Sequence, residues 1–430
     1  MCKLAIGVPT YNRADMVEEM LIRCAEIYQK KGVDIYFFDS SPDERTEVIV
    51  LRYKAEYENV YYRKFPADTH SNIKVLEIYK ELLGIAEYEY LWLCPDYMQL
   101  TPPGLEFVLC QCDRELDAFV LNYRDVEHIG RKAYKDADTF FLDCAWHMSS
   151  YMATVIRSAS FMDIEWEKFY ERYTVPERIN FSHLAFYFEQ LAKLPEIKAA
   201  HVPVSPSHIR VSSYRENSFW KKEVFYTWCT CWPDTIRALP ERYHYKDEVI
   251  FKQGINSRIL SWNNFLSLRR EKIYDIHVYQ KYRSEWKNLT DVPGMRLLLL
   301  SVLPSFAIKG SRYNRKRERT KRRLRKFCKN NPKRYIYGCG YVSRMTTALL
   351  KELHIKSEGY IVSDLSGEKK VFNGLKVISC EEFLEKETDA SIIFALKKEH
   401  ADQVMNEHQQ LELFRIFFMY PYVNDMEILS

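Results

Sequence analysis

The chain has 430 residues, enough for roughly two to four domains, and 47% of them are hydrophobic, which excludes a disordered protein. The net charge is only +4, and it is unevenly spread. Residues 309–334 contain fourteen lysines and arginines and a single acid, so the rest of the chain carries about −9. This distribution argues against a generally basic, nucleic-acid-coating protein and indicates one basic segment with a role of its own.

The eleven cysteines include no C-x-x-C pair, and strand-like alternation explains Cys110/Cys112 and Cys229/Cys231 as well as metal binding does. Free thiols predict a reducing compartment. The apolar run at the N-terminus is too short for a signal peptide, and no run approaches the roughly 20 residues that cross a bilayer. We therefore expect a cytoplasmic protein without a zinc site.

Strands and helices alternate over the first 130 residues. Short apolar runs predict strands at residues 3–8, 34–38, 59–65, 90–93 and 117–123, and apolar periodicity predicts helices at 17–28 and 73–83. Asn12 is the expected N-cap of the first helix, with Asp15 three residues on. This alternation predicts a parallel, doubly wound α/β sheet that binds its ligands at the carboxyl ends of the strands.

The remainder is helical up to the basic segment and then alternates again. Residues 140–194, 220–239 and 246–268 have helical patterns, and a polar loop at 205–218 separates the first two. From residue 334 a strand, a glycine turn and a helix open a second alternating unit. We expect a domain at 1–250, a helical and basic connecting region at 251–330, and a small Rossmann-like domain at 331–430.

Polar side chains gather where the first two predicted strands end. Thr10, Asn12 and Arg13 follow the first strand, where the free N–H groups of a helix start favour a phosphate or a base edge. Asp39 ends the second strand, and Ser41 follows it. An acid in this position either accepts hydrogen bonds from a nucleoside or closes an Asx turn, and the residues alone leave both open.

The stretch YLWLCPDYMQL, residues 90–100, leads a buried strand to a single acid, Asp96. Many nucleotide-using enzymes hold a metal at such a place, but they usually supply two or three acids, and Pro95 and Tyr97 cannot bind a metal through their side chains. One carboxylate can still bind Mg²⁺ or Mn²⁺ together with waters and phosphate oxygens. Asp96 is therefore a metal ligand, the remnant of one, or a strand cap.

Four motifs resemble, in their order and spacing, the opening of a family-2 glycosyltransferase with the GT-A fold. They are IGVPTYNR at 6–13, FFDSSPD at 37–43, DTHSNIK at 68–74 and LWLCPDY at 91–97. The likeness covers residues 1–130 well and 140–250 loosely. It implies a nucleotide-sugar site at the strand ends described above.

The resemblance implies a role for each matching residue. The donor nucleoside would be held by Thr10, Asn12, Arg13, Asp39 and Ser41. Lys74 would reach the base or a phosphate, and Asp96 would be what is left of the family's D-x-D segment. The family's acid cluster is absent, so the residues do not decide between two alternatives. One is a full metal site; the other is weak metal dependence, or Mn²⁺ or Mg²⁺ that is bound mainly through the nucleotide.

The resemblance also locates the catalytic base and the acceptor side. An E-D pair opens the family helix that faces the reaction centre, and Ser182 and His183 occupy its place here. His183 is the candidate base, because an imidazole titrates near pH 6.5, and a surface or helix-cap histidine is the alternative. Trp146 and His147 are expected on the acceptor side.

The polar loop at 205–218 holds His208 and Arg210. A mobile loop with these groups can clamp a departing diphosphate and offset its developing charge. A solvated basic loop explains the same residues equally well.

The segment 295–334 joins apolar residues between 297 and 308 to the basic run. An interfacial helix that binds anionic lipid has this composition, and a lipid-linked acceptor would require it. A solvated linker helix is the alternative. Nucleic acid is disfavoured because no recognition motif accompanies the charge.

In the C-terminal part, Gly338 and Gly340 follow a predicted strand and open a helix, as a dinucleotide fingerprint does, although Ser343 replaces its third glycine. Asp364 lies about 20 residues on, at a spacing that fits ribose binding. Nucleotide binding, a structural or oligomerising role and a dead site all stay open.

These features and the family resemblance together predict a glycosyltransferase of the hexosyltransferase class, located in the cytoplasm or peripherally at the inner face of the membrane, and the resemblance implies that it is inverting. It would move sugar from a nucleoside-diphosphate sugar, UDP-sugar favoured, to a saccharide or lipid-linked acceptor in bacterial surface or capsular polysaccharide synthesis. The alternative is a non-catalytic nucleotide-sugar-binding or assembly protein with a degenerate site. A nucleotidyltransferase is a poorer interpretation of the sequence, because PTYNR is not a glycine- and lysine-rich phosphate loop. A homo-oligomer stays open.

Overall fold

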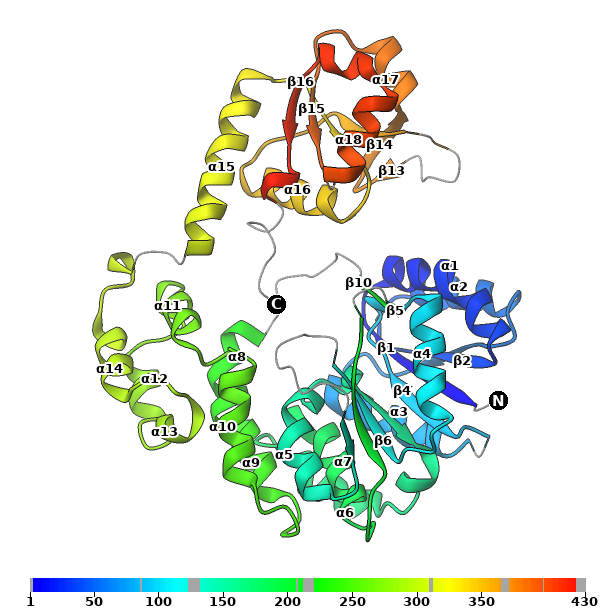
Figure 1. Cartoon of the computed structure of the whole chain (residues 1–430), viewed down its shortest axis with the longest axis vertical. Coiled ribbons are helices and arrows are strands. Elements are labelled where there is room, and N and C mark those ends of the chain that lie inside the picture. The colour runs from blue at the N-terminus through cyan, green and yellow to red at the C-terminus, as the bar shows by residue number, and fades with distance from the viewer. Residues whose placement is uncertain are drawn as a thin grey trace. The chain divides into compact units, whose positions relative to one another are not determined.

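The computed structural model describes residues 3–85, 87–122, 132–205, 208–211, 220–308, 312–363, 365, 371–396 and 398–422. The chain forms two compact units, which divide between Ala307 and Ile308 (Figure 1). Each unit contains a sheet with helices, so the α/β class expected from the sequence is confirmed.

Eight strands form the sheet of the first unit within the described residues. In spatial order they are β3 (Val60–Lys64), β2 (Val33–Asp39), β1 (Leu4–Thr10), β4 (Tyr90–Leu93), β8 (Thr154–Arg157), β6 (Ala118–Asn122), β9 (Ala199–Pro203) and β7 (Lys132–Tyr134). Strands β1 to β4 run parallel to one another, whereas β8 is antiparallel to both β4 and β6. The chain therefore runs outward from β1 to β3 and returns to β4 on the other side of β1, which makes the carboxyl ends of β1 and β4 a topological switch point.

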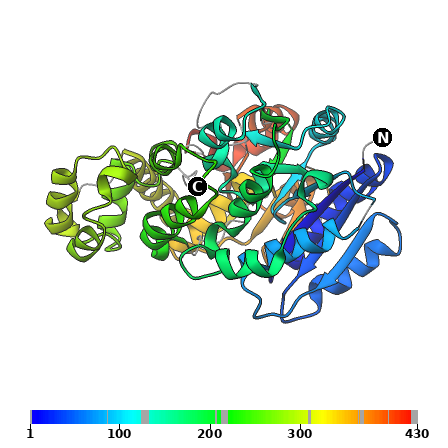
Figure 2. The ribbon, with the colours of Figure 1, turned by 90° about the horizontal axis from the view of Figure 1, so that it is seen from below.

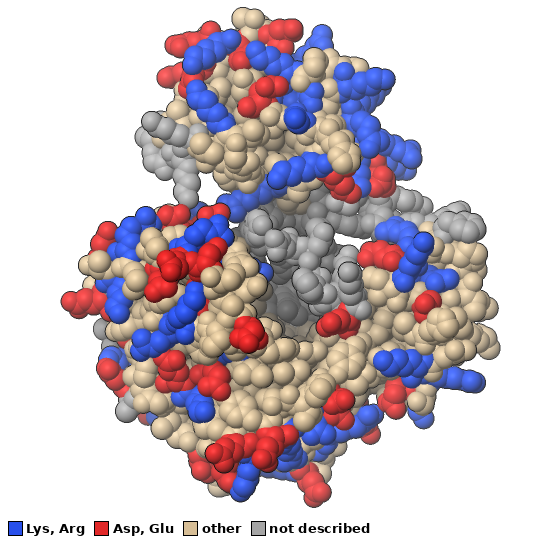
Figure 3. Space-filling model, turned by 180° about the vertical axis from the view of Figure 1, so that it is seen from behind, with Lys and Arg blue, Asp and Glu red and all other residues tan. Residues whose placement is uncertain are grey.

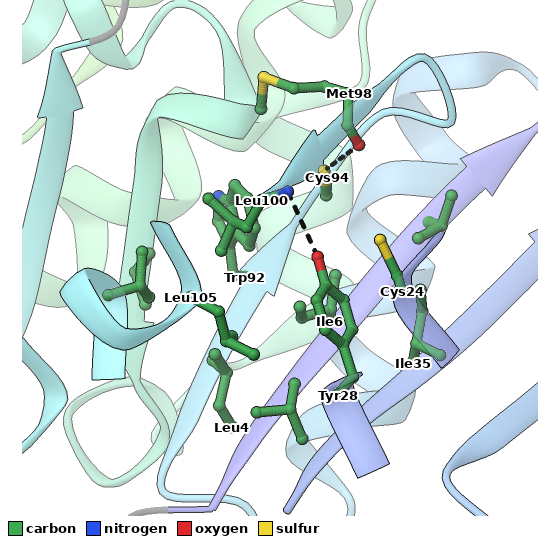
Figure 4. Packing of buried hydrophobic residues seen from close by; sticks show 14 of the residues in the cluster. Leu4, Ile6, Cys24, Tyr28, Ile35, Trp92, Cys94, Met98, Leu100 and Leu105 are labelled. Carbon is green, nitrogen blue, oxygen red and sulfur yellow. Dashed lines mark hydrogen bonds between the residues drawn. The ribbon is translucent and has the colours of Figure 1, made fainter. Parts of the chain in front are cut away.

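One face of this sheet is covered by α1 (Ala14–Lys30), α2 (Arg45–Lys54) and α4 (Pro102–Cys112). Figure 4 shows Ile6 of β1 and Trp92 of β4 packed against Cys24 and Tyr28 of α1, all of them buried. The Tyr28 hydroxyl accepts a hydrogen bond from the backbone N–H of Leu100, at 3.3 Å, and so ties α1 to the short strand β5 (Met98–Leu100).

The other face is covered by α3 (Ser71–Leu83), α5 (Ala137–Met148) and α7 (Ser182–Leu191), and α6 (Trp166–Tyr173) packs on α7. The hydroxyls of Tyr79 and Tyr187 share a buried hydrogen bond of 2.6 Å between α3 and α7. Helix α3 also packs directly onto Gly7 of β1. A Cβ on Gly7 would lie 2.6 Å from Leu93 and 2.8 Å from Ile78, so the contact requires glycine.

A helical region completes the first unit (Figure 2). It comprises α8 (Trp220–Tyr226), α9 (Trp232–Ala238), α10 (Lys246–Asn256), α11 (Trp262–Arg270), α12 (Ile276–Lys281), α13 (Trp286–Leu289) and α14 (Gly294–Val302). Phe225, Phe265, Tyr274 and Trp286 form its buried aromatic centre. A short strand, β10 (Ile209–Val211), lies inside the segment that we expected to be a polar loop.

The second unit contains, in spatial order, β13 (Val371–Phe372), β14 (Leu375–Ser379), β12 (Gly359–Val362), β11 (Arg334–Tyr337), β15 (Ser391–Phe394) and β16 (Arg415–Phe418). All pair in parallel except β13 with β14. Its helices are α15 (Arg312–Asn330), α16 (Tyr341–Glu352), α17 (Cys380–Lys386) and α18 (Lys398–Glu407).

The expected connecting region at 251–330 is not a separate part of the structure. Its first portion packs within the first unit, whereas α15 belongs to the second. The reason is that Leu324 and Cys328, hidden among basic residues in the sequence, are buried in the core of the second unit. The boundary at 250 is therefore corrected to 307.

The charged residues visible in Figure 3 are of both signs, with Lys and Arg interspersed among Asp and Glu over the first unit. In the described part of the chain, we find no helix with the length and apolar character needed to cross a membrane.

Replacing Gly7 with alanine should destabilise the first unit, because the new methyl group overlaps Leu93 and Ile78. Overpacking of this kind costs about 1–3 kcal/mol. All eight tryptophans lie in the first unit, so urea unfolding followed by tryptophan fluorescence measures this unit alone. Gly294→Ala is the control, since a Cβ there meets open space at the start of α14. Equal unfolding midpoints for the two variants would contradict the close packing at Gly7.

Candidate functional site

A network of polar side chains crosses the carboxyl ends of β1, β2 and β4. Thr10, the last residue of β1, donates a hydrogen bond from its hydroxyl to Oδ2 of Asp96, at 2.9 Å. Asp96 follows β4 and is 1% exposed. The two residues therefore join the strands that flank the switch point, and the buried carboxylate lies between them.

A left-handed turn brings Arg13 to the same carboxylate. Asn12 has a φ of 53°, a conformation that asparagine adopts more readily than most residues, and its backbone N–H donates to the Ser41 hydroxyl at 2.7 Å. Arg13 Nη1 then donates to Asp96 Oδ1 at 2.9 Å. The N-cap residue of α1 is Arg13, without a side-chain cap, so the expected N-cap role of Asn12 is corrected.

Asp39, at the end of β2, is fully buried. Its Oδ1 accepts hydrogen bonds from the backbone N–H and the hydroxyl of Ser41, which is an Asx turn. Its Oδ2 accepts from the Tyr62 hydroxyl at 3.0 Å and lies 3.4 Å from Lys64 Nζ. Of the two roles that the sequence left open for Asp39, the turn-forming role matches this geometry.

Lys74 enters the network from α3. It is 4% exposed, and its Nζ donates to the backbone oxygen of Thr10 and to the Ser40 hydroxyl, both at 2.8 Å. Burial lowers the pKa of Lys74 from 10.5 to about 8, against the opposing effect of Asp39 and Asp96. Lys74 therefore links the carboxyl ends of β1 and β2 from the side of the sheet on which α3 lies.

Apart from the buried Lys74, the cations of this network are more exposed than its acids. The carboxylates of Asp39 and Asp96 are 0% and 2% exposed, whereas the side chains of Arg13 and Lys64 are 35% and 40% exposed. The acids are therefore inside, and Arg13 and Lys64 form a partly exposed cationic rim around them. Tyr11, half exposed, lies beside them in the chain. A rim of this kind favours an anionic ligand.

A divalent cation does not fit Asp96 in this arrangement. Each carboxylate oxygen already accepts a hydrogen bond, one from Thr10 and one from Arg13, and the guanidinium charge beside Oδ1 would repel a metal ion. Burial raises the pKa of Asp96, while Arg13, Thr10 and Lys74 oppose that rise. Among the residues that the structure describes, no group of three or more His, Cys, Asp or Glu side chains could hold a metal ion.

Strand β10 places Arg210, one of the two residues expected to clamp a diphosphate, beside the segment that follows Asp96. It pairs antiparallel with β5, and Arg210, which is exposed, lies opposite Gln99. The backbone oxygen of His208 accepts from Thr101 N–H at 3.0 Å, and a Cβ on Gly104 would lie 2.0 Å from it. The His208 ring itself packs against a phenylalanine, Phe107, so Arg210 is the better placed of the two expected residues.

His183 lies at the start of α7, as expected, but inside the protein. It is 3% exposed, its Nε2 lies 3.1 Å from the backbone oxygen of Ser149, and its Nδ1 has no partner among the described residues. Burial lowers the pKa of His183 to about 4. A neutral, enclosed imidazole of such low basicity is poorly suited to accept a proton from an acceptor hydroxyl. The geometry therefore argues against His183 as the base.

The residues expected on the acceptor side are also buried. Trp146 and His147 are 3% and 5% exposed, their rings are 3.7 Å apart, and the ring of His201 lies 5.1 Å from that of His147. These residues form part of the packing around α5, and the acceptor-side role expected of them stays a prediction.

In the second unit, Gly338 has a φ of +102° and forms the turn between β11 and α16 with Gly340, which precedes α16. The Ser343 hydroxyl donates to the Gly338 backbone oxygen at 2.7 Å. Asp364 lies outside the described residues. The nucleotide site expected at these positions stays a prediction.

Sequence reasoning missed Ser40, Tyr62 and Lys64. Tyr62 and Lys64 alternate along β3, and the parallel register places Lys64 opposite Asp39. That register could have been inferred by aligning the carboxyl ends of the two strands, which would have brought a lysine to the buried acid.

No family model and no curated protein matches the chain in sequence. Solved structures resemble it at low TM-scores. S. aureus TarS 1–349 is 15% identical, with 66% of this chain and 91% of that chain covered and a TM-score of 0.37. Mannosyltransferase PcManGT from Pyrobaculum calidifontis, in complex with GDP-Man and Mn²⁺, is 13% identical over 69% and 78%, with a TM-score of 0.36.

Glucosyl-3-phosphoglycerate synthase from Mycobacterium tuberculosis is 8% identical over 56% of this chain and 81% of that chain, with a TM-score of 0.38. A structure of TarS 1–349 in complex with UDP-GlcNAc has a TM-score of 0.36 and 14% identity, with 66% of this chain and 84% of that chain covered. Likeness at this level carries no conclusion about what this chain binds.

The lowered pKa of Lys74 predicts a pH dependence of stability. Between pH 8 and 10.5 the unfolded lysine binds a proton that the folded one does not, so the free energy of unfolding rises with pH across this window. Relative to Lys74→Met, the wild type should gain roughly 2–3 kcal/mol from pH 8 to 10.5. Urea unfolding followed by tryptophan fluorescence at several pH values measures the difference. Lys54→Met, on the exposed side of α2, should parallel the wild type, and a parallel Lys74→Met curve would disprove the prediction.

Proposed function

We propose that the first unit is a GT-A glycosyltransferase that takes its sugar from a nucleoside-diphosphate sugar, with UDP-sugar favoured. The observation that supports it best is the network at the switch point, where two buried acids hold cations at the rim. Ligands of open α/β sheets bind in this crevice. The donor's diphosphate is the anion that such a rim suits, and exposed Tyr11 offers a ring face to its base.

The sequence resemblance supports the same proposal. Of its matching residues, Thr10, Asn12, Arg13, Asp39, Ser41, Lys74 and Asp96 belong to one hydrogen-bonded network or to its turn. The family's usual course would then apply: an acceptor hydroxyl oxygen attacks the anomeric carbon in line, and the diphosphate leaves with the bonding electrons. The acceptor's proton must pass to a base other than His183, given its burial.

We further propose that the acceptor is a saccharide or a lipid-linked saccharide of a bacterial surface polysaccharide, reached at an anionic membrane surface. Helix α14 supports the membrane contact. Met295, Leu299, Val302 and Leu303 are 46–68% exposed and, at helical spacing, share one face, while Leu297 and Leu300 are buried. Exposed Arg296 adds positive charge beside this face.

Helix α15 contributes less to such a contact than its composition suggests. Leu324 and Cys328, its buried apolar residues, belong to the core of the second unit. Lys321 is paired with Glu318 and Glu352. The membrane-facing element in this proposal is therefore α14, and α15 contributes no more than its basic charge to the contact.

A non-catalytic nucleotide-sugar-binding protein is the second candidate. It is favoured by one observation: both acids of the network, Asp39 and Asp96, are committed to partners within the protein. Neither is free to activate an acceptor. The two candidates share the nucleotide site and differ in turnover.

Calorimetric titration with UDP and GDP tests the shared site. We expect UDP to bind, and Lys64→Met to weaken it about threefold to tenfold, because one rim charge in partial solvent contributes up to ~1 kcal/mol or slightly more. Lys54→Met is the matched control. No binding of either nucleotide at millimolar concentration would refute the assignment. UDP release from a panel of UDP-hexoses with saccharide acceptors would then separate a transferase from a binding protein.

Sedimentation with vesicles tests the membrane contact. The full chain should pellet with phosphatidylcholine vesicles that contain phosphatidylserine, and Leu299→Asp should weaken this by at least about tenfold, because burying one leucine contributes about 1.5–3 kcal/mol. Val48→Asp, at an exposed position of α2, is the control and should sediment like the wild type. Equal sedimentation of both variants would exclude α14 as the contact.

A further inference from the structure

The two members of the Arg13–Asp96 ion pair differ in how far the protein occupies their hydrogen-bonding groups. Asp96 is buried and uses Oδ2 for Thr10 and Oδ1 for Arg13. Arg13 uses one N–H for this contact, and its remaining N–H groups have no partner among the described residues. Its side chain is 35% exposed. The acid is thus satisfied, whereas the arginine keeps donors for a ligand.

This difference matters because Asp96 is the carboxylate to which a divalent metal would have to bind. A divalent ion could reach it only by displacing Arg13, which would break a buried ion pair. It would also approach Lys74, whose charge acts on Asp96. The site therefore already holds a cation at the carboxylate, and that cation is part of the chain.

We propose that Arg13, held in place by Asp96, takes the position of the divalent metal at the donor's diphosphate, so that nucleotide binding is metal-independent. This inference rests on the proposed function. A guanidinium is suited to the role, because its planar fork binds two phosphate oxygens at once and its charge is permanent. Arg13 is then the diphosphate-binding residue, and Asp96 is a positioning residue that acts through it.

The surrounding turn fixes the direction of Arg13. Asn12, in its left-handed conformation, is bonded through its N–H to Ser41, and α1 begins immediately after Arg13. Thr10 holds the other oxygen of Asp96. The guanidinium is therefore supported from two strands and a helix start before any ligand binds, which lowers the ordering cost of binding.

The first test needs no variant. The wild-type full chain is titrated with whichever of UDP and GDP binds better, and with the matching nucleoside, in EDTA and in Mn²⁺. We expect dissociation constants of the nucleotide that agree within about threefold between the two conditions. A nucleotide affinity at least tenfold weaker in EDTA would overturn the inference.

The second test assigns the role to Arg13. Arg13→Met should weaken the nucleotide at least tenfold and leave the nucleoside unchanged, and Arg13→Lys, which keeps the charge but not the fork, should fall between it and the wild type. Asp96→Asn should weaken the nucleotide less than Arg13→Met does. Arg52→Met, which removes an arginine from an exposed ion pair with Glu18, is the matched control. Unchanged nucleotide affinity in Arg13→Met would overturn the inference.

The outcomes separate this inference from the proposed function. If the wild type binds neither nucleotide in either condition, the proposed function fails. If it binds only with Mn²⁺, the function stands and the role of Arg13 fails. Thermal unfolding of each variant identifies a loss of fold, and in that case the comparison of EDTA with Mn²⁺ on the wild type still decides the inference.

Discussion

The structure of the site depends on the neutralisation of one buried carboxylate. Asp96 is 1% exposed, and an unpaired charge in such a place is strongly unfavourable. Two contacts satisfy it, from Thr10 and Arg13. To make the second, the chain must turn sharply after β1, which the left-handed Asn12 allows. The start of α1, and with it the packing of α1 on the sheet, follows from that turn.

A second set of hydrogen bonds holds this turn, and with it Arg13, in place. Lys74 reaches from α3 to the backbone of Thr10 and the hydroxyl of Ser40, and Asp39 fixes Ser41, whose hydroxyl accepts from Asn12. The ends of β1 and β2 are thus bound to the same turn that directs Arg13. Because these contacts are buried and mutually dependent, they position the rim cations with little freedom.

The sequence predicted which residues meet, because the carboxyl ends of parallel strands share one sheet edge, but not how they pair. Asp96 could be read as a ligand, remnant or cap, since its partner is set by a backbone turn that the residue types alone do not reveal. His183 was expected at a helix start and lies there, yet its burial depends on α5 and the segment around Ser149, far away in the chain. Leu324 and Cys328 were obscured by the basic residues around them, so the boundary of the second unit was predicted too late.

The network's net charge depends on one proton. Arg13, Lys64 and Lys74 are its cations and Asp39 and Asp96 its acids, so the five groups sum to +1 with Lys74 protonated and to zero without that proton. Burial places the pKa of Lys74 at about 8, within reach of ordinary pH. A diphosphate at the rim adds negative charge nearby and must raise that pKa, since a nearby opposite charge favours the protonated form. Anion binding and protonation of Lys74 are therefore linked, although Lys74 itself lies beneath the rim and contacts only the protein in this structure.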